Sequence, residues 1–183
     1  MTTLSSAGWV VHDLGLATTI GGSLFGQVAL EPALEEIRSA RERDLASEKA
    51  WTRFSWIKLA SHAAFAVPWI IGRTMLTGEE VSARARALTR TKDILVGASL
   101  ITGVASHIIG RILGNKVKRG EGPEQAREGK ASEDKESKAL EAAVWVTGGL
   151  NLIATAGVLA VTALLAMEGS ESVKFAVDSR RLP

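Results

Sequence analysis

The chain of 183 residues contains no cysteine. This absence excludes disulfides, thiolate zinc sites, iron–sulfur clusters and thiol redox chemistry, because each of them needs a cysteine sulfur. The chain also has little net charge, since 22 Lys and Arg residues are interleaved with 20 Asp and Glu residues. A net charge of +2 without a concentrated basic face argues against nucleic acid as a partner.

Signals for export and for common enzyme chemistry are also missing. Residues 1–12 contain no Lys or Arg, whereas a cleaved signal peptide begins with a basic region, so we expect the first apolar segment to be retained as a helix. The sequence has no Asn-x-Ser/Thr glycosylation site, no Gly-x-Ser-x-Gly nucleophile motif and no phosphate-binding loop. An enzyme is therefore the less favoured class.

Long apolar runs are what the sequence does contain. Residues 142–167 form a stretch of 26 residues without a charge, which is long enough to cross a hydrocarbon core of about 30 Å. Three shorter uncharged runs reach a similar length when flanking residues are added, because Lys and Arg at a helix end can extend their charged groups to the membrane surface. The sequence therefore predicts a single all-α domain, an integral membrane four-helix bundle. The expected spans are residues 9–30, 54–76, 94–113 and 142–167.

Two charged connections indicate the orientation. Residues 31–53 are predicted to be a charged helical cytoplasmic connection, and residues 114–141 a polar, charged cytoplasmic loop with almost no apolar side chains. These connections and their flanks carry thirteen basic residues, against seven on the opposite side. The positive-inside rule then places both termini outside. We expect the lipid bilayer of a bacterial cytoplasmic membrane as the surroundings.

Two predicted spans carry the same tripeptide, Ala-Ser-His, which ends at His62 and at His107. Each His lies four residues from a basic residue, Lys58 or Arg111, so antiparallel packing predicts that the two imidazoles share one depth. Two imidazoles at one depth can ligate a haem b. The favoured interpretation is a structural hydrogen-bonding pair, because His commonly joins membrane helices in this way. No metal site is predicted, since no third ligand lies at that depth.

A second pair of polar residues is expected near the outer surface. Asp13 lies one turn inside the first predicted span, and Arg73 lies at the end of the second at a comparable height. An unpaired charge inside a membrane is costly, so the sequence predicts a structural ion pair between Asp13 and Arg73. A proton relay through His12 and Asp13 is the alternative.

Glycines at four-residue spacing mark expected contact faces. Gly22 and Gly26 form one such pair, and Gly110 and Gly114 form another. Small residues at this spacing let helix backbones approach closely. The two pairs are therefore predicted to be helix-packing positions within the bundle or against another chain.

These features favour a small accessory or structural subunit that acts through helix–helix contacts in a membrane complex. Its expected partners are other membrane-protein subunits or a second copy of the chain. One alternative is an electron-transfer protein with haem b held by His62 and His107. A second alternative is an oligomeric small-solute transporter or channel, which is less favoured because few polar groups lie at the centre of the spans.

Overall fold

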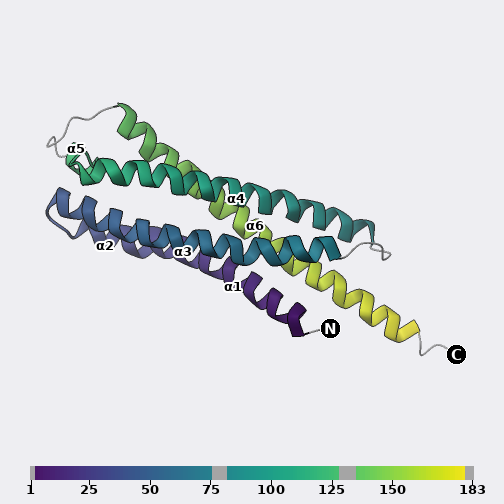
Figure 1. Ribbon diagram of the computed structural model, residues 1–183. Coiled ribbons are helices and arrows are strands. Elements are labelled where there is room, and N and C mark those ends of the chain that lie inside the picture. The colour runs from purple at the N-terminus through teal and green to yellow at the C-terminus, as the bar shows by residue number, and fades with distance from the viewer. Residues whose placement is uncertain (1–2, 76–81, 128–134, 180–183) are drawn as a thin grey trace.

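The computed structural model describes residues 3–75, 82–127 and 135–179, and these residues are almost entirely helical. Long helical segments run alongside one another with short helices at one end (Figure 1). The elements in chain order are α1 (Thr3–Phe25), the π-helical turn η1 (Gly26–Leu30), α2 (Glu31–Glu35), α3 (Ala40–Met75), α4 (Ala83–Lys118), α5 (Pro123–Arg127) and α6 (Lys135–Ser179).

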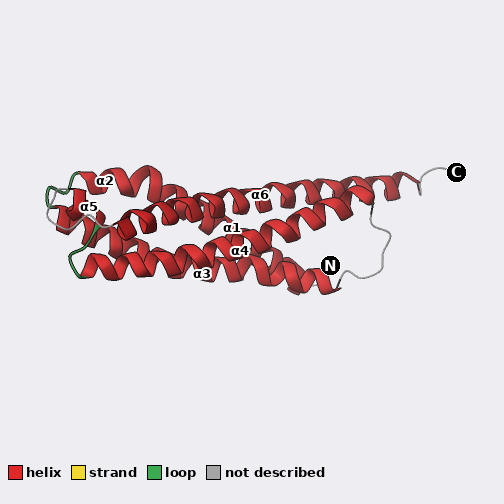
Figure 2. Cartoon of the chain, turned by 90° about the horizontal axis from the view of Figure 1, so that it is seen from above, coloured by secondary structure: helices red, strands yellow, loops and turns green. Residues whose placement is uncertain are grey.

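Each long helix packs against two others. The main contacts join α1 to α3, α3 to α4, α4 to α6, and α6 back to α1. The start of α1 and the end of α6 lie at one end of the molecule, and α2 and α5 lie at the other, as the two perpendicular views in Figures 1 and 2 agree. The two predicted connections therefore meet at the same end of the helices.

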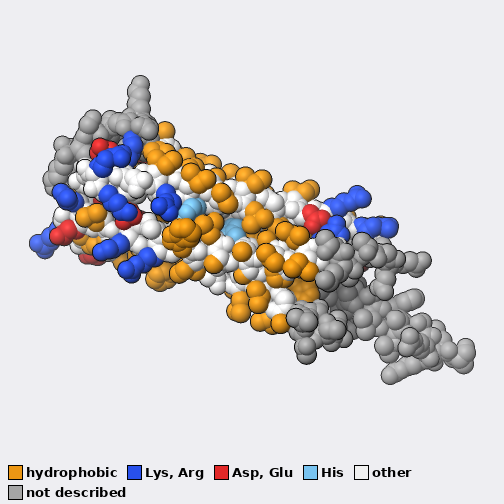
Figure 3. All heavy atoms as spheres, in the orientation of Figure 1, with side chains coloured by type: hydrophobic (Ala, Val, Ile, Leu, Met, Phe, Trp, Pro, Cys, Tyr) orange, Lys and Arg blue, Asp and Glu red, His pale blue; other side chains and the backbone are white. Residues whose placement is uncertain are grey.

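Three helices are long and apolar enough to cross a membrane. The qualifying segments are Ala40–Arg73 in α3, Ala83–Lys118 in α4 and Ala139–Glu168 in α6, and they contain most or all of the predicted second, third and fourth spans. The remaining long helix, α1, does not qualify, because His12, Asp13 and several glycines lower its mean hydropathy. Hydrophobic side chains cover the middle of the face shown in Figure 3, with charged side chains toward its ends. This distribution is typical of an integral membrane protein.

The helices extend well beyond the apolar runs. Ser82 caps α4 by accepting a hydrogen bond from the N–H of Ala85 at 3.0 Å, so this helix begins about three turns before the predicted span at residue 94. At its other end Gly120, with φ of +83°, adopts the left-handed conformation that terminates a helix. As a result, residues 114–118 of the predicted loop are helical.

The two charged connections contain more structure than a plain helix and a loop. Residues 31–53 comprise α2, a turn at residues 36–39 that reverses the chain, and the first part of α3. Residues 114–141 comprise the end of α4, the short helix α5 and the start of α6, while residues 128–134 lie outside the described residues. The described part of the predicted polar loop is thus largely helical, because the strong helix formers at each side continue the neighbouring helices.

Candidate functional site

Buried polar side chains form two layers in the bundle, one on each side of the Phe65 ring. Phe65 is fully buried, and its ring centroid lies 6.2 Å from that of His12 and 5.2 Å from that of His62. Both polar layers thus lie inside the helical bundle, where ionisable groups need internal partners.

Lys92 is the centre of the first layer, which we call the cage. Its ammonium lies 3.1 Å from Nε2 of His12 and packs over the rings of Trp69 and Trp9, at 4.0 and 5.1 Å from their centroids. His12 Nδ1 donates to the carbonyl oxygen of Phe65 at 2.5 Å, so Nε2 is the nitrogen that accepts from Lys92. A fully buried cation is therefore held by one imidazole and two aromatic faces.

Lys92 was missed by the sequence analysis because the apolar run begins only at Ile94. Helical periodicity is the signal that could have found it. Lys92, Val96, Ser99 and Gly103 recur at intervals of three or four residues, and all four are buried on one face of α4.

The predicted ion pair between Asp13 and Arg73 is wrong, because Arg73 pairs with Asp93. Its Nη2 and Nε lie 3.1 and 3.2 Å from Asp93 Oδ2, and the Trp69 indole N–H donates to Oδ1 at 2.8 Å. Asp93 is on α4, which brings it to the height of Arg73 on the neighbouring helix α3. The sequence analysis compared only charges within the predicted spans, and Asp93 fell just outside them.

His62 is the centre of the second layer, which we call the central network. Its Nδ1 donates to the Lys58 carbonyl oxygen at 2.7 Å, and its Nε2 lies 3.0 Å from Asn151 Nδ2 and 3.2 Å from Ser99 Oγ. Asn151 also donates to the Ser99 carbonyl oxygen at 2.7 Å, and the hydroxyls of Ser99 and Thr155 share a hydrogen bond of 2.8 Å. These contacts join α3, α4 and α6 through side chains that are almost completely buried.

His107 does not share the depth of His62, so that prediction is wrong. Its Nδ1 lies 3.1 Å from Ser55 Oγ, and Ser55 precedes His62 on α3 by seven residues, about 10 Å along a helix. The side chain of His62 instead faces Gly103, where an added Cβ would lie 2.7 Å from Nε2. Because both His62 nitrogens have protein partners, the geometry does not favour haem ligation by His62 and His107.

The first glycine pair lies against aromatic rings of α3. Side chains added at Gly22 and Gly26 would collide with the rings of Phe54 and Trp51, respectively. The Trp51 indole N–H also donates to Glu31 Oε1 at 2.6 Å. The end of α1 and the start of η1 therefore pack closely on α3, because glycine leaves room for two large side chains.

The second glycine pair is not a uniform contact face. A Cβ at Gly114 would lie 3.2 Å from the Glu48 side chain, whereas one at Gly110 would meet nothing within 4 Å. The sequence analysis also missed Gly15, where an added Cβ would lie 2.6 Å from the backbone oxygen of Ser61. The recurrence of glycine at residues 8, 15 and 22 is a seven-residue spacing that could have indicated this face.

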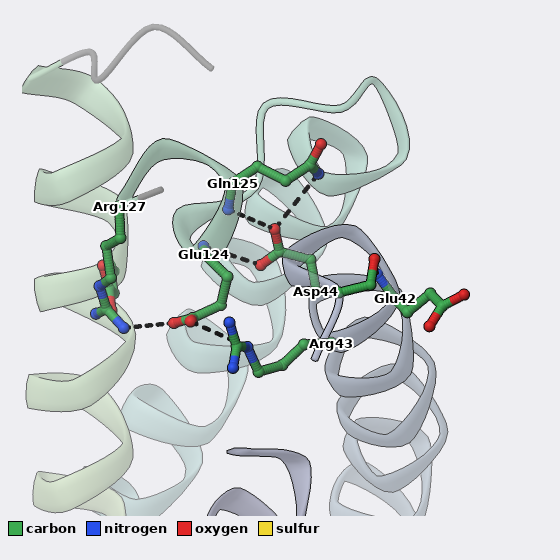
Figure 4. A network of polar contacts seen from close by, with 8 residues as sticks. Glu42, Arg43, Asp44, Glu124, Gln125 and Arg127 are labelled. Carbon is green, nitrogen blue, oxygen red and sulfur yellow. Dashed lines mark hydrogen bonds and ion pairs between the residues drawn. The ribbon is translucent and has the colours of Figure 1, made fainter. Parts of the chain in front are cut away.

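At the end that carries α2 and α5, the two charged connections are joined by a polar clasp. Asp44, which is 3% exposed, accepts hydrogen bonds from the backbone N–H groups of Glu124 and Gln125, both at 3.2 Å (Figure 4). Arg43 lies 3.1 Å from Glu124, and Arg127 pairs with the same carboxylate. Asp44 thereby caps α5 from another helix, which the sequence alone did not predict.

Next to this clasp lies a cavity of about 780 Å³, which we call the inner cavity. Residues from every element of the structure contribute to its wall, and they include Lys58, His107 and Arg111. The described residues contain no group of three or more side chains that could hold a metal ion. Comparisons with protein-family models, with curated proteins and with solved structures give no match to this chain.

Proposed function

We propose that α1 crosses the membrane together with α3, α4 and α6, which makes the chain a four-helix integral membrane bundle. The polar residues of α1 that lower its hydropathy include His12, which is buried within the bundle. The segment from α1 through η1 contains 28 residues, about 42 Å of helix, which is sufficient for a span. Large apolar side chains cover its exposed face, at Val10, Val11, Leu14, Leu24, Phe25 and Val28.

The proposed orientation places the α2 and α5 end in the cytoplasm and both termini outside. The excess of Lys and Arg on the two charged connections supports it. Because the chain has no cysteine, single-cysteine labelling with a membrane-impermeant thiol reagent is a direct test. We expect a cysteine at Glu121 to react only from the cytoplasmic side and one at Arg86 only from outside. The reverse labelling would contradict the orientation.

Within this membrane bundle, we propose an accessory or structural subunit that works through its helix faces. The observation that carries this proposal is the central network, in which both nitrogens of His62 are bonded to protein groups from α3, α4 or α6. Buried hydrogen bonds of this kind hold helices together, and they leave neither nitrogen of His62 free to act as a ligand or base. The outer faces are then left for contact with other membrane-protein subunits or a second copy.

Photo-crosslinking in native membranes tests this proposal. A photoreactive residue is placed in turn at Ile153, Ile101 and Val28, which are at least 70% exposed on α6, α4 and η1. We expect a discrete protein adduct from at least one of these faces. Lipid adducts alone from all three faces would contradict a function through helix contacts.

An absorption spectrum separates the same proposal from the haem alternative. We expect the purified full chain to show no Soret band. A Soret band that disappears in both His62→Ala and His107→Ala would contradict the structural interpretation, because a six-coordinate site needs both nitrogens.

A second candidate function is ion or proton transport, and the cage is the observation that favours it. Lys92 on α4 is fully buried against His12 of α1 and Trp69 of α3. Ionisable groups within membrane segments commonly mark ion pathways. In proteoliposomes with a pH-sensitive dye, this function predicts a proton flux that Lys92→Met abolishes. Absence of flux, or an equal flux through Lys92→Met, would exclude it.

A further inference from the structure

The inner cavity has the size of a ligand site and lies apart from the helix faces of the proposed function. Its volume of about 780 Å³ falls within the usual range for pockets that bind small molecules. Its wall combines charged groups with apolar ones, so an occupant with both a charged and an apolar part fits it best. The apolar part of the wall includes Leu34, Phe54, Leu113, Val144 and Trp145.

The carboxylates in the cavity wall are mostly occupied by the protein. Glu31 accepts from the Trp51 indole, and Glu48 accepts from the Thr52 hydroxyl and pairs with Lys118 at 3.1 Å. The carboxylates at the clasp end are held by backbone N–H groups or by arginines, and they are Asp44, Glu124 and Glu141. Glu35 also lines the cavity, so three of the six wall carboxylates, Glu48, Glu124 and Glu141, are paired with a Lys or Arg of the protein.

The cations nearer the middle of the bundle are not neutralised in this way. Lys58 and Arg111 both line the cavity and lie in segments that can span a membrane. Neither is paired with a carboxylate in the part of the chain that the structure describes. Arg111 instead packs over the ring of Trp56, 6.0 Å from its centroid. Lys58 is partly buried and Arg111 is exposed, so both can offer their charge to an anion that enters the cavity.

Helix direction brings these two cations toward one level. Side chains on a helix tilt toward its N-terminus, and α3 and α4 run antiparallel. Lys58 therefore tilts toward the α2 and α5 end, whereas Arg111 tilts away from it. His107 lies between them along α4, and its Nε2 has no hydrogen-bond partner among the described residues, since only Nδ1 contacts Ser55.

We propose that the inner cavity binds a phosphate-bearing anion through Lys58 and Arg111, next to His107. A membrane phospholipid is the source that the apolar wall favours, because its acyl chain can lie against that wall while its phosphate meets the cations. Basic pockets between membrane helices at the cytoplasmic side bind anionic headgroups in this manner. The same two cations also suit a free phosphate, so the test separates these sources.

Lipid retention by the full-length protein tests the site. The protein is reconstituted in bilayers of phosphatidylcholine and phosphatidylglycerol, extracted in mild detergent, and the bound phosphatidylglycerol is counted by native mass spectrometry. We expect the double variant Lys58→Gln with Arg111→Gln to bind this lipid about thirtyfold more weakly, from the usual contribution of two basic residues. The matched control is Arg86→Gln with Arg90→Gln, two exposed residues near the other end of α4, which should retain the lipid.

A second variant keeps the test independent of the two charges. Gly110 lines the cavity, and a Cβ there meets nothing within 4 Å, so Gly110→Leu adds apolar volume to the wall from a Cβ position that is free of contacts. We expect it to reduce lipid retention while the melting temperature in lipid-free detergent stays unchanged. Because Gly110→Leu leaves every charge of the native chain in place, a loss of bound lipid in this variant would show that the lipid occupies the cavity.

Addition of inorganic phosphate in lipid-free detergent identifies the source. If phosphate alone raises the melting temperature of the native chain but not of the Lys58 and Arg111 double variant, the anion site stands with free phosphate as its ligand. Equal lipid retention and equal phosphate response in the native chain and both cavity variants would overturn the proposal. Crosslinking at the outer helix faces plays no part in these measurements, so their failure is distinct from failure of the accessory-subunit function.

Discussion

Gly15→Ala is the sharpest test of whether α1 belongs to the bundle as a fourth membrane helix. The added methyl carbon would lie 2.6 Å from the Ser61 backbone oxygen, 2.9 Å from the Phe65 nitrogen and 3.1 Å from the Ala64 Cβ. Two of these neighbours are backbone atoms of α3, which cannot rotate away. The substitution therefore forces α1 and α3 apart where they cross.

The magnitude follows from two opposing terms. Overpacking of this kind typically costs about 1 to 3 kcal/mol, and replacing glycine by alanine within a helix gains about 0.5 to 1 kcal/mol. Gly21→Ala is a matched control on the same helix, because a Cβ at Gly21 meets nothing within 4 Å. Both variants share the propensity gain, so the free energies of unfolding should differ by about 1 to 3 kcal/mol, with Gly15→Ala the less stable.

Unfolding in mixed detergent micelles, titrated with sodium dodecyl sulfate and followed by tryptophan fluorescence, measures this difference. Trp9 on α1 and Trp69 on α3 pack together with ring centroids 6.3 Å apart, so their fluorescence reports on the same contact. Equal stability of Gly15→Ala and Gly21→Ala would refute the close crossing of α1 and α3. It would also remove the structural support for α1 as a fourth span.

Three further predictions address the polar contacts. His62→Ala and Asn151→Ala should each destabilise the chain by about 0.5 to 2 kcal/mol, and the double variant by less than their sum, since both belong to the central network; additive losses in the same unfolding assay would show that the two do not couple. Asp93→Asn should lower the free energy of unfolding by only about 0.2 to 1 kcal/mol, because the ion pair of Asp93 with Arg73 is about 40% exposed. Adding Arg73→Gln to the Asp93→Asn variant should then cause no further loss of stability. A further loss as large as the first would mean that Arg73 has another partner. Asp44→Ala should free α5 and speed its cleavage by trypsin, as loss of a cap costs about 0.5 to 2 kcal/mol; an unchanged cleavage rate would argue against the clasp.

Apolar run length was sufficient to predict the helical class and three of the membrane segments, because a stretch such as residues 142–167 has few stable alternatives to a spanning helix. The same measure misjudged helix ends. Lys92 was assigned to a connection because hydropathy stops at Ile94, while the helix itself continues back to Ala83. The mean hydropathy of a segment measures how apolar the segment is, but it does not show on which face of the helix each residue lies.

The partners of buried polar groups could not be predicted from spacing. His62 and His107 end the same tripeptide, Ala-Ser-His, yet one contacts Ser99 and Asn151 and the other contacts Ser55. Their depths depend on the axial register of α3 against α4. That register is fixed by packing across the interface, for example by the close fit of His62 against Gly103.

The sequence by itself determined the all-helical class and three long apolar helices, because these follow from the composition of consecutive residues. Tertiary structure alone decided which polar groups meet: Lys92 with His12, Arg73 with Asp93, and Asp44 with the start of α5. The physical reason is that each such contact joins residues between 20 and 80 positions apart. Their distance depends on the rotation and axial position of whole helices, which only the combined packing of the bundle sets.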